Sequence, residues 1–160
     1  MILKGRKRKS DVITIGVDSS TTSCGVAVFI NGKLDATDNY KFVGTYDIDK
    51  LHAISVVFGK LFSDYKPEIV LLEEPINVRN ARTAMGLNQV AGAIVSLAVM
   101  SGAHVGYVHN KTMKKIYNIV TKDDSVRVAT RDFGVKEPIS EHEADAILVV
   151  GTYMRLYGDL

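Results

Sequence analysis

The first part of the chain, up to about Val43, alternates between apolar and polar positions in short runs, as β-strands do. Two apolar runs, 12–17 and 25–30, precede the dipeptide Asn31-Gly32, and a third run follows it. Asn-Gly between apolar runs is a strong hairpin signal, because both residues accept the positive φ angles of a tight turn. This part of the chain therefore predicts three consecutive strands.

The pattern changes its period at residues 49–64, where apolar side chains recur every three or four positions and predict an amphipathic helix. Residues 68–73 are apolar except at their ends, which predicts a buried strand that Pro75 terminates. The remaining elements that we expect are helices at 81–101, 112–120 and 140–157, a strand at 104–108 and a loop at 122–137.

This order of elements predicts an α/β fold, with a mixed five-stranded sheet flanked by helices. Ser140 and Glu143 have the spacing of a capping box, which supports a helix start at that point. A length of 160 residues suits a single domain. We expect this domain to span residues 11–160, behind a basic tail of residues 1–10.

Charge is distributed unevenly along the chain. Residues 1–10 carry five of the 20 basic side chains and none of the 18 acidic ones, so the net charge of +2 becomes −3 once this tail is left out. Such a run is either an arm attracted to phosphates or a solvated end, and both interpretations stay open. A second basic group consists of Lys111, Lys114, Lys115 and Lys122.

The apolar segments and the cysteine content indicate a compartment. The longest apolar stretch, residues 90–100, is shorter than the roughly 20 residues that span a bilayer, so we expect no transmembrane segment and no membrane partner. No apolar segment with a cleavage site follows the basic N-terminus, so a secretory signal is not expected. The single cysteine, Cys24, suits a packed position in a reducing compartment. We therefore expect an intracellular protein.

Acidic residues end both of the expected buried strands. Asp18 follows the first strand and Glu73 ends the strand at 68–73, so the two carboxylates converge if these strands are neighbours. Like charges placed so close together are costly without a cation between them. Glu74 is expected to face the other way, because strand side chains alternate. Asp18, which precedes Ser and Thr residues, also suits a simple turn former.

The last helix begins with a third acidic group. His142 and Asp145 lie three residues apart, so they share a helix face and can reach the same ion. Glu141 and Glu143 suit the positive end of the helix dipole, a position that acidic residues favour even where they bind no ion. Glu143 also remains an alternative to His142 as the ligand beside Asp18, Glu73 and Asp145. Carboxylates favour Mg²⁺ or Mn²⁺, whereas a tight zinc site needs more imidazole or thiolate.

These residues together resemble the RuvC group of the RNase H-like superfamily. The resemblance rests on Gly16-Val17-Asp18, on Glu73, on His142-x-x-Asp145, and on the segment that contains Asn80, Ala81, Gln89 and Gly92. Two departures concern the turn after the first strand, where Ser19-Ser20 replaces Pro-Gly, and Ile76, where bacterial relatives often carry an aromatic residue. The basic tail is an addition that a short phage-encoded resolvase would fit.

The resemblance implies a structure-selective endodeoxyribonuclease that resolves Holliday junctions and other branched DNA by paired nicks. It implies that Asp18, Glu73, His142 and Asp145 bind two Mg²⁺ ions, for which Mn²⁺ substitutes, and that hydrolysis leaves a 5′-phosphate and a 3′-hydroxyl. Lys114, together with Lys122, is expected to offset charge on the reacting phosphate. The residues expected at the DNA are Ile76, Asn77, Arg79, Asn80, Arg82, Lys111, Lys115 and Lys122.

Paired nicks need two active sites, which raises the question of a homodimer. Residues 90–100 are apolar nearly all round the expected helix, more than one sheet face buries. This surplus predicts either a deeply internal helix or an isologous helix-to-helix interface.

Three other functions stay open at this point. The segment from Gly16 to Ser23, followed by Val28-Phe29, also resembles the first phosphate loop of sugar kinases, although those phosphotransferases need more than twice this length. A nuclease of the same fold that acts on RNA precursors is the second alternative. A relative that binds DNA without cutting it is the third.

Overall fold

The computed structural model describes residues 10–75, 79–136 and 138–158. They form a five-stranded sheet in the order β3-β2-β1-β4-β5. β1 pairs antiparallel with β2 and parallel with β4, β2 pairs antiparallel with β3, and β4 pairs parallel with β5. The predicted mixed sheet is confirmed. The strands are β1 (Ile13–Ser19), β2 (Ser23–Ile30), β3 (Lys33–Lys41), β4 (Ile69–Glu73) and β5 (His104–Val108).

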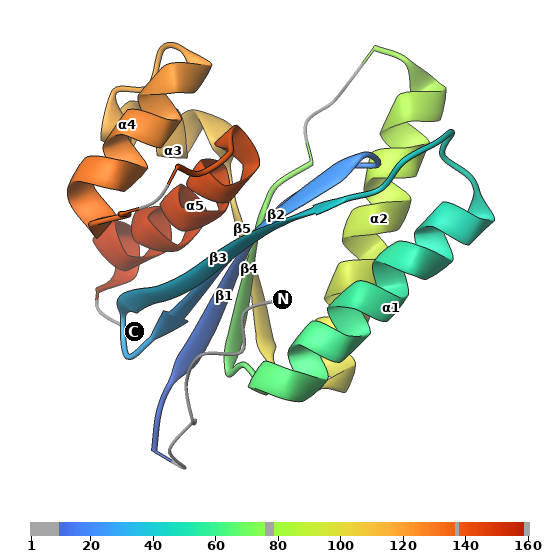
Figure 1. Cartoon of the computed structure of the whole chain (residues 1–160), viewed down its shortest axis with the longest axis horizontal. Coiled ribbons are helices and arrows are strands. Elements are labelled where there is room, and N and C mark those ends of the chain that lie inside the picture. Colours follow the sequence, from blue (N-terminus) through green and yellow to red (C-terminus); the bar gives the residue numbers. More distant parts are fainter. Residues whose placement is uncertain (1–9, 76–78, 137, 159–160) are drawn as a thin grey trace.

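Helices cover both faces of the sheet (Figure 1). α1 and α2 pack against one face, where they enclose an apolar core with β1, β2 and β4. α5 packs against the other face and carries α3 and α4 on its outer side, so a second apolar core forms there. The helices are α1 (Ile48–Tyr65), α2 (Ala81–Met100), α3 (Asn110–Tyr117), α4 (Lys122–Phe133) and α5 (Glu141–Tyr157).

The predicted loop at residues 122–137 is wrong, because most of it is helix α4. Its apolar face is short: Ser125, Val128 and Ala129 are its buried residues, Val126 and Phe133 are partly buried, and the remaining side chains are charged or polar. The start is fixed locally, since the Asp124 carboxylate accepts the backbone N–H of Thr121 at 2.8 Å. The helix ends at Gly134, whose φ of 67° terminates it in the left-handed region.

Two glycines let α5 lie directly on the sheet. A Cβ at Gly16 of β1 would stand 2.2 Å from the Ala146 carbonyl oxygen, and one at Gly25 of β2 would stand 2.0 Å from that of His142. Any side chain at these positions would push the helix away. Gly25 also pairs with Asp18 across the β1–β2 ladder, so the first turn of α5 lies beside the end of β1.

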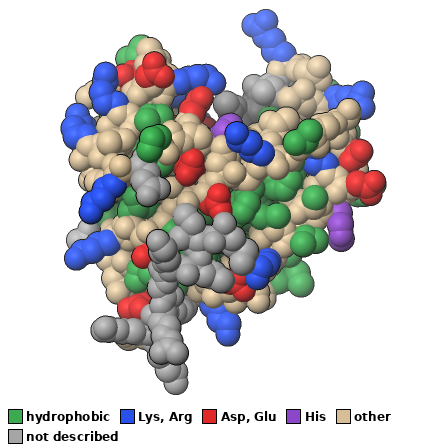
Figure 2. Space-filling view, in the orientation of Figure 1, with side chains coloured by type: hydrophobic (Ala, Val, Ile, Leu, Met, Phe, Trp, Pro, Cys, Tyr) green, Lys and Arg blue, Asp and Glu red, His purple; other side chains and the backbone are tan. Residues whose placement is uncertain are grey.

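Helix α2 is buried on one face and exposed on the other. One face is buried through Val90, Ala91, Ile94 and Ala98, while Val99 and Met100 are 59% and 82% exposed. By length and composition alone, α2 is apolar enough to cross a membrane, a property that core helices of soluble proteins share. Figure 2 shows hydrophobic side chains surfacing on the α1 side of the molecule, while Lys and Arg side chains are spread over the whole view.

Candidate active site

Side chains from the ends of β1 and β4 and from the start of α5 meet around one cleft of about 290 Å³. The parallel pairing of β1 and β4 places Asp18 and Glu73 at the same edge of the sheet, as the sequence predicted. Its lining residues are Asp18, Glu73, Asn110, Lys114, Ile119, Val120, Thr121, Lys122, Ser125, Glu141, His142 and Asp145.

Asp18 and His142 are in direct contact. The Nδ1 atom of His142 lies 2.6 Å from Oδ2 of Asp18, which joins the first turn of α5 to the end of β1. This hydrogen bond, with the negative charges of Asp18, Glu141 and Asp145 around it, raises the pKa of His142 against the opposing effect of burial. The contact with Asp18 therefore favours the positively charged form of the His142 imidazole.

Glu73 sits at the end of β4 and is largely buried. Burial, followed by the charge of Asp18, raises its pKa from 4.5 to about 7, although Asn110 and Lys114 act in the opposite direction. Asn110 donates a hydrogen bond from Nδ2 to Oε1 of Glu73 at 2.5 Å. Asn110 thus fixes the position of the Glu73 carboxylate. Ionisation of Glu73 still costs free energy that Asn110 and Lys114 do not fully offset.

Asp145 has the same cost and an unused oxygen. Burial raises its pKa from 3.8 to about 6, and the charges of Asp18 and Glu141 add to the rise, while a hydrogen bond with Ser125 lowers it. Its Oδ1 atom is buried and finds no hydrogen-bond partner among the described residues. A buried carboxylate oxygen without a partner is what a cation site leaves when its ion is not present.

The donors suit a hard divalent cation in kind, because they are carboxylates with one imidazole. As they are placed, however, no three acidic, His or Cys side chains of the described segments surround a single point closely enough to hold an ion. The contact between His142 and Asp18 accounts for part of this, since each occupies a donor atom of the other. The contact uses one donor atom of each residue, so Oδ1 of Asp18 and Nε2 of His142 remain available to an ion.

Two of the predicted lysines line the cleft and two do not. Lys114 lies on its wall and lowers the pKa of Glu73. Lys122, at the first position of α4, pairs with Glu141 at 3.1 Å. Lys111 and Lys115 are exposed on α3, outside the cleft.

Of the predicted DNA contacts after Glu73, Arg79, Asn80 and Arg82 are described and lie beyond the cleft. Asn80 caps α2, because its side-chain oxygen accepts the backbone N–H groups of Arg82 at 2.9 Å and Thr83 at 3.2 Å. Arg79 and Arg82 are exposed. Ile76 and Asn77 lie outside the described residues.

Asn110 and Ser125 are site residues that the sequence interpretation missed. Asn110 follows the end of β5 after one residue, His109, so its position at the carboxyl edge of the sheet was a usable signal. Ser125 lies on α4, in the segment where the sequence predicted a loop. The contact between Ser125 and Asp145 depends on that helix.

Glu143 does not line the cleft, so the geometry favours His142 as the fourth ligand. Glu74 is exposed and lines an adjoining hollow of about 190 Å³ that also contains Asp18, Ser19, Ser20, Glu73, Pro75 and Leu87.

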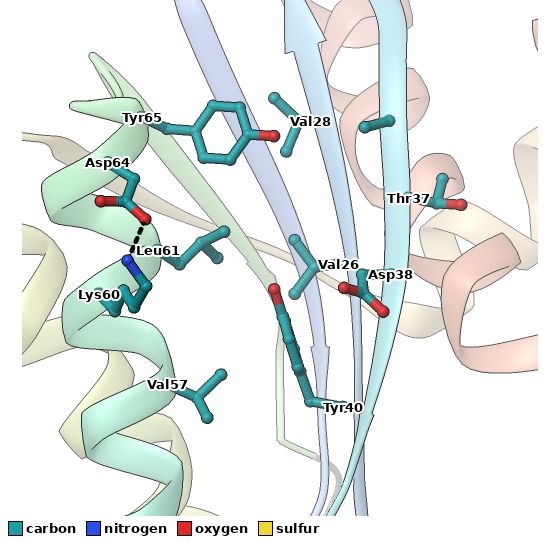
Figure 3. A pocket seen from close by; sticks show the side chains of 11 residues that line it. Val26, Val28, Thr37, Asp38, Tyr40, Val57, Lys60, Leu61, Asp64 and Tyr65 are labelled. Atoms are coloured by element: carbon teal, nitrogen blue, oxygen red, sulfur yellow. Dashed lines mark hydrogen bonds and ion pairs between the residues drawn. The ribbon is translucent and has the colours of Figure 1, made fainter. Parts of the chain in front are cut away.

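A further cavity, of about 130 Å³, lies between α1 and strands β2 and β3, on the opposite face of the sheet (Figure 3). Its walls are apolar, with Val26, Val28 and Leu61 among them. Of its two acidic residues, Asp64 is paired with Lys60 at 2.8 Å, and Asp38 accepts the backbone N–H of Asn39 at 2.8 Å. This cavity has the concavity of a binding site but none of the unsatisfied charge that the cleft contains.

Comparison with known proteins bears on the chemistry of the cleft. The family model for crossover junction endodeoxyribonuclease RuvC matches residues 14–152, a span that begins in β1 and ends in α5. The chain belongs to the RuvC family. It is therefore a nuclease, and the family needs a divalent metal. The match decides between the sequence alternatives in favour of phosphodiester hydrolysis over phosphotransfer.

Two RuvC relatives show the extent of the likeness. RuvC of Carboxydothermus hydrogenoformans is 28% identical, over 84% of this chain and 90% of that protein. RuvC of Treponema denticola is 26% identical, over 99% of this chain and 95% of that protein. The likeness thus covers the whole fold rather than a local motif.

Solved structures agree on the fold. RuvC of T. thermophilus in complex with a Holliday junction substrate has a TM-score of 0.77 and 20% identity, over 92% of this chain and 98% of that chain. The yeast mitochondrial Holliday junction resolvase has a TM-score of 0.65 and 11% identity, over 90% of this chain and 78% of that chain. The predicted RNase H-like fold is confirmed.

Proposed function

We propose that this chain resolves Holliday junctions and other branched DNA by paired nicks that leave a 5′-phosphate and a 3′-hydroxyl. The observation that carries the proposal is the buried cluster of Asp18, Glu73 and Asp145, with the Oδ1 atom of Asp145 unpartnered, in a chain of the RuvC family. The T. thermophilus relative, with the same fold, is a complex with a Holliday junction substrate.

The metal of this site is proposed to be Mg²⁺, with two ions held by Asp18, Glu73, His142 and Asp145 and with Mn²⁺ able to replace it. When bound, such ions supply an activated water and neutralise the leaving 3′ oxygen. Carboxylate chemistry supports the choice of metal, because hard cations favour oxygen ligands. The raised pKa values of Glu73 and Asp145 support the need for positive charge.

The residues of the chain itself have separable tasks. Asp18, Glu73 and Asp145 supply the negative charge that holds cations, and Asn110 keeps the Glu73 carboxylate in place through its 2.5 Å hydrogen bond. Lys114, on the wall of the same cleft, places a fixed positive charge where the phosphate would enter. Lys122 reaches the cleft as well, but it shares its charge with Glu141.

The DNA itself is proposed to lie across the mouth of the cleft. Phosphates would be contacted by the exposed side chains of Arg79, Arg82, Lys111 and Lys115, with Asn80 beside them, and by the basic tail of residues 1–10. Ile76 is proposed to act as an apolar wedge at the branch point, and Asn77 to contact phosphates. Such a protein would act inside the cell, with no membrane partner.

Two opposed nicks need two active sites, so we propose a homodimer. The outer face of α2 supports this, because Met85, Val99 and Met100 are apolar side chains that are 58%, 59% and 82% exposed. Met85 lies near the start of α2 and Val99 and Met100 lie at its end, and these side chains suit an isologous contact with the same helix of a second copy.

The proposal is tested by nicking assays with Mg²⁺ on a four-way junction, a Y-structure and a structured RNA. We expect the four-way junction to be cut fastest. Asp18→Asn should lower its cutting by at least about 10³-fold, because several kcal/mol of metal-dependent stabilisation disappear, while binding of the junction is retained. Asp38→Asn, which alters a carboxylate on the other face of the sheet, should change the rate less than twofold.

Each alternative has its own outcome in this assay. Preferential cutting of the RNA would replace the proposal by a nuclease of RNA precursors. Junction binding without cutting by the wild-type protein would make the chain a non-cutting relative. Loss of folding and binding together in Asp18→Asn would make Asp18 structural.

A further inference from the structure

The Glu143 carboxylate joins the start of α5 to the edge of the sheet. Its Oε2 atom accepts hydrogen bonds from the backbone N–H of Ser140 at 2.9 Å and from the Ser140 hydroxyl at 2.8 Å, which closes the capping box. Its Oε1 atom accepts a third hydrogen bond, from the Thr37 hydroxyl at 2.8 Å. The capping box lies within residues 140–143 and does not reach the sheet. The bond to Thr37 does reach it, and together with the His142–Asp18 contact it ties the first turn of α5 to the sheet at two points.

Thr37 is well placed for this contact. It lies on the edge strand β3, opposite Ala27 of β2, and Ala27 in turn lies opposite Gly16 of β1. Figure 3 shows the Thr37 side chain pointing away from the apolar cavity, whereas its neighbour Asp38 points to the α1 side. The hydroxyl of Thr37 therefore faces α5 across the breadth of β2.

Helix geometry connects this contact to the cleft. Successive residues are about 100° apart around an α-helix, so Glu143 and Asp145 lie on opposite flanks of α5, with His142 between them. The glycine contacts at Gly16 and Gly25 set how closely α5 approaches the sheet, whereas a side contact such as Thr37–Glu143 resists its rotation. A rotation of about 10° would displace a carboxylate at the helix surface by about 1 Å, an error that costs about 10²-fold in well-positioned catalysis.

We infer that Thr37 and Glu143 are positioning residues for the active site, which hold α5 at the rotation that aims His142 and Asp145 at the ends of β1 and β4. Neither touches the cleft, so they act through His142 and Asp145. This inference rests on the proposed function for its catalytic consequence, but not for its structural one.

The test compares Thr37→Val, which keeps the shape and removes the hydroxyl, with Thr37→Ser, which keeps the hydroxyl. Valine suits a strand, so the fold is expected to withstand the change and the Tm to stay within about 3 °C. Thr37→Val should lower kcat for junction cutting about 5- to 20-fold and weaken Mn²⁺ binding about 3- to 10-fold, with KM for the DNA unchanged. Thr37→Ser should restore both to within twofold of the wild-type protein.

A readout that needs no activity accompanies the kinetics. Amide hydrogen exchange of residues 141–145 should be at least fivefold faster in Thr37→Val than in the wild-type protein or in Thr37→Ser, with exchange elsewhere in α5 unchanged. Wild-type exchange, kcat and Mn²⁺ affinity in Thr37→Val would overturn the inference, as would equal defects in both variants. If the wild-type protein cuts no substrate, the proposed function fails, and the exchange measurement still decides whether Thr37 holds the helix.

Discussion

The two faces of the sheet each carry a hollow, and the hollows differ in what their walls leave unsatisfied. The cavity beside α1 is lined mainly by apolar side chains, and its Asp64 is paired with Lys60. The cleft beside α5 is lined by charged and polar groups, and two of its carboxyl groups have pKa values raised to about 7 and about 6. Apolar concavity is the usual guide to a small-molecule site, but here the proposed chemistry lies in the polar hollow.

The difference shows that uncompensated charge marks a catalytic cleft better than shape does. Folding brings Asp18, Glu73 and Asp145 together at a cost that nothing in the described part of the chain offsets fully. A fold that retains such a cost has a use for it, because replacing these groups by neutral ones would stabilise the protein. The carboxylates of the α1 side leave no buried oxygen without a partner.

The largest effect expected in this comparison concerns the lysines of the two hollows. Lys114→Met should lower kcat for junction cutting about 10- to 100-fold, because it removes a positive charge next to the reacting phosphate. It should also move the acidic limb of the pH–rate profile upward, since Lys114 lowers the pKa of Glu73. Lys60→Met, at the apolar cavity, should leave the rate within twofold. Equal effects of the two changes, measured in single-turnover nicking assays, would remove Lys114 from the catalytic group.

A smaller effect concerns stability without metal. The pKa of Glu73 is raised in the folded protein, so folding favours its neutral form. Its contribution to stability is therefore lost as pH rises from 4.5 to about 7. Glu73→Gln, which can still accept the hydrogen bond from Asn110, should match the wild-type Tm at pH 4.5 and exceed it by about 3–6 °C at pH 8, after allowance for partial exposure.

Asp64→Asn is the matched control for this measurement, because it neutralises a carboxylate of the other hollow. Its Tm difference from the wild-type protein should be small and the same at both pH values, since it loses an ion pair at the surface. A Tm gain for Glu73→Gln that does not depend on pH would show that burial of charge at Glu73 is not its cause.

Much of the site could be predicted from the sequence because its residues stand at element ends. Asp18 and Glu73 end buried strands that pair in parallel, and His142 and Asp145 open a helix whose capping box is visible in the sequence. The prediction was conditional on the two strands being neighbours, because carboxyl ends of adjacent parallel strands share one edge of the sheet. The pairing of β1 with β4 meets that condition.

What could not be predicted depends on contacts between distant elements. Ser125 meets Asp145 because α4 packs on α5, and the mixed charges of α4 concealed its short apolar face. Glu143 was interpreted as a response to the helix dipole or as a rival ligand, and its bond to Thr37 crosses 106 positions of sequence. The periodicity of apolar residues predicts which face of a helix or strand is buried, but it does not predict which side chain of a neighbouring strand that face contacts.

Calorimetric titration of the metal-free protein with Mn²⁺ tests whether the cluster of Asp18, Glu73, His142 and Asp145 is a metal site. We predict saturable binding by the wild-type protein, at least tenfold weaker binding by Asp145→Asn, and wild-type binding by Asp64→Asn. Binding by Asp145→Asn that equals that of the wild-type protein, or no binding by the wild-type protein at all, would contradict this prediction.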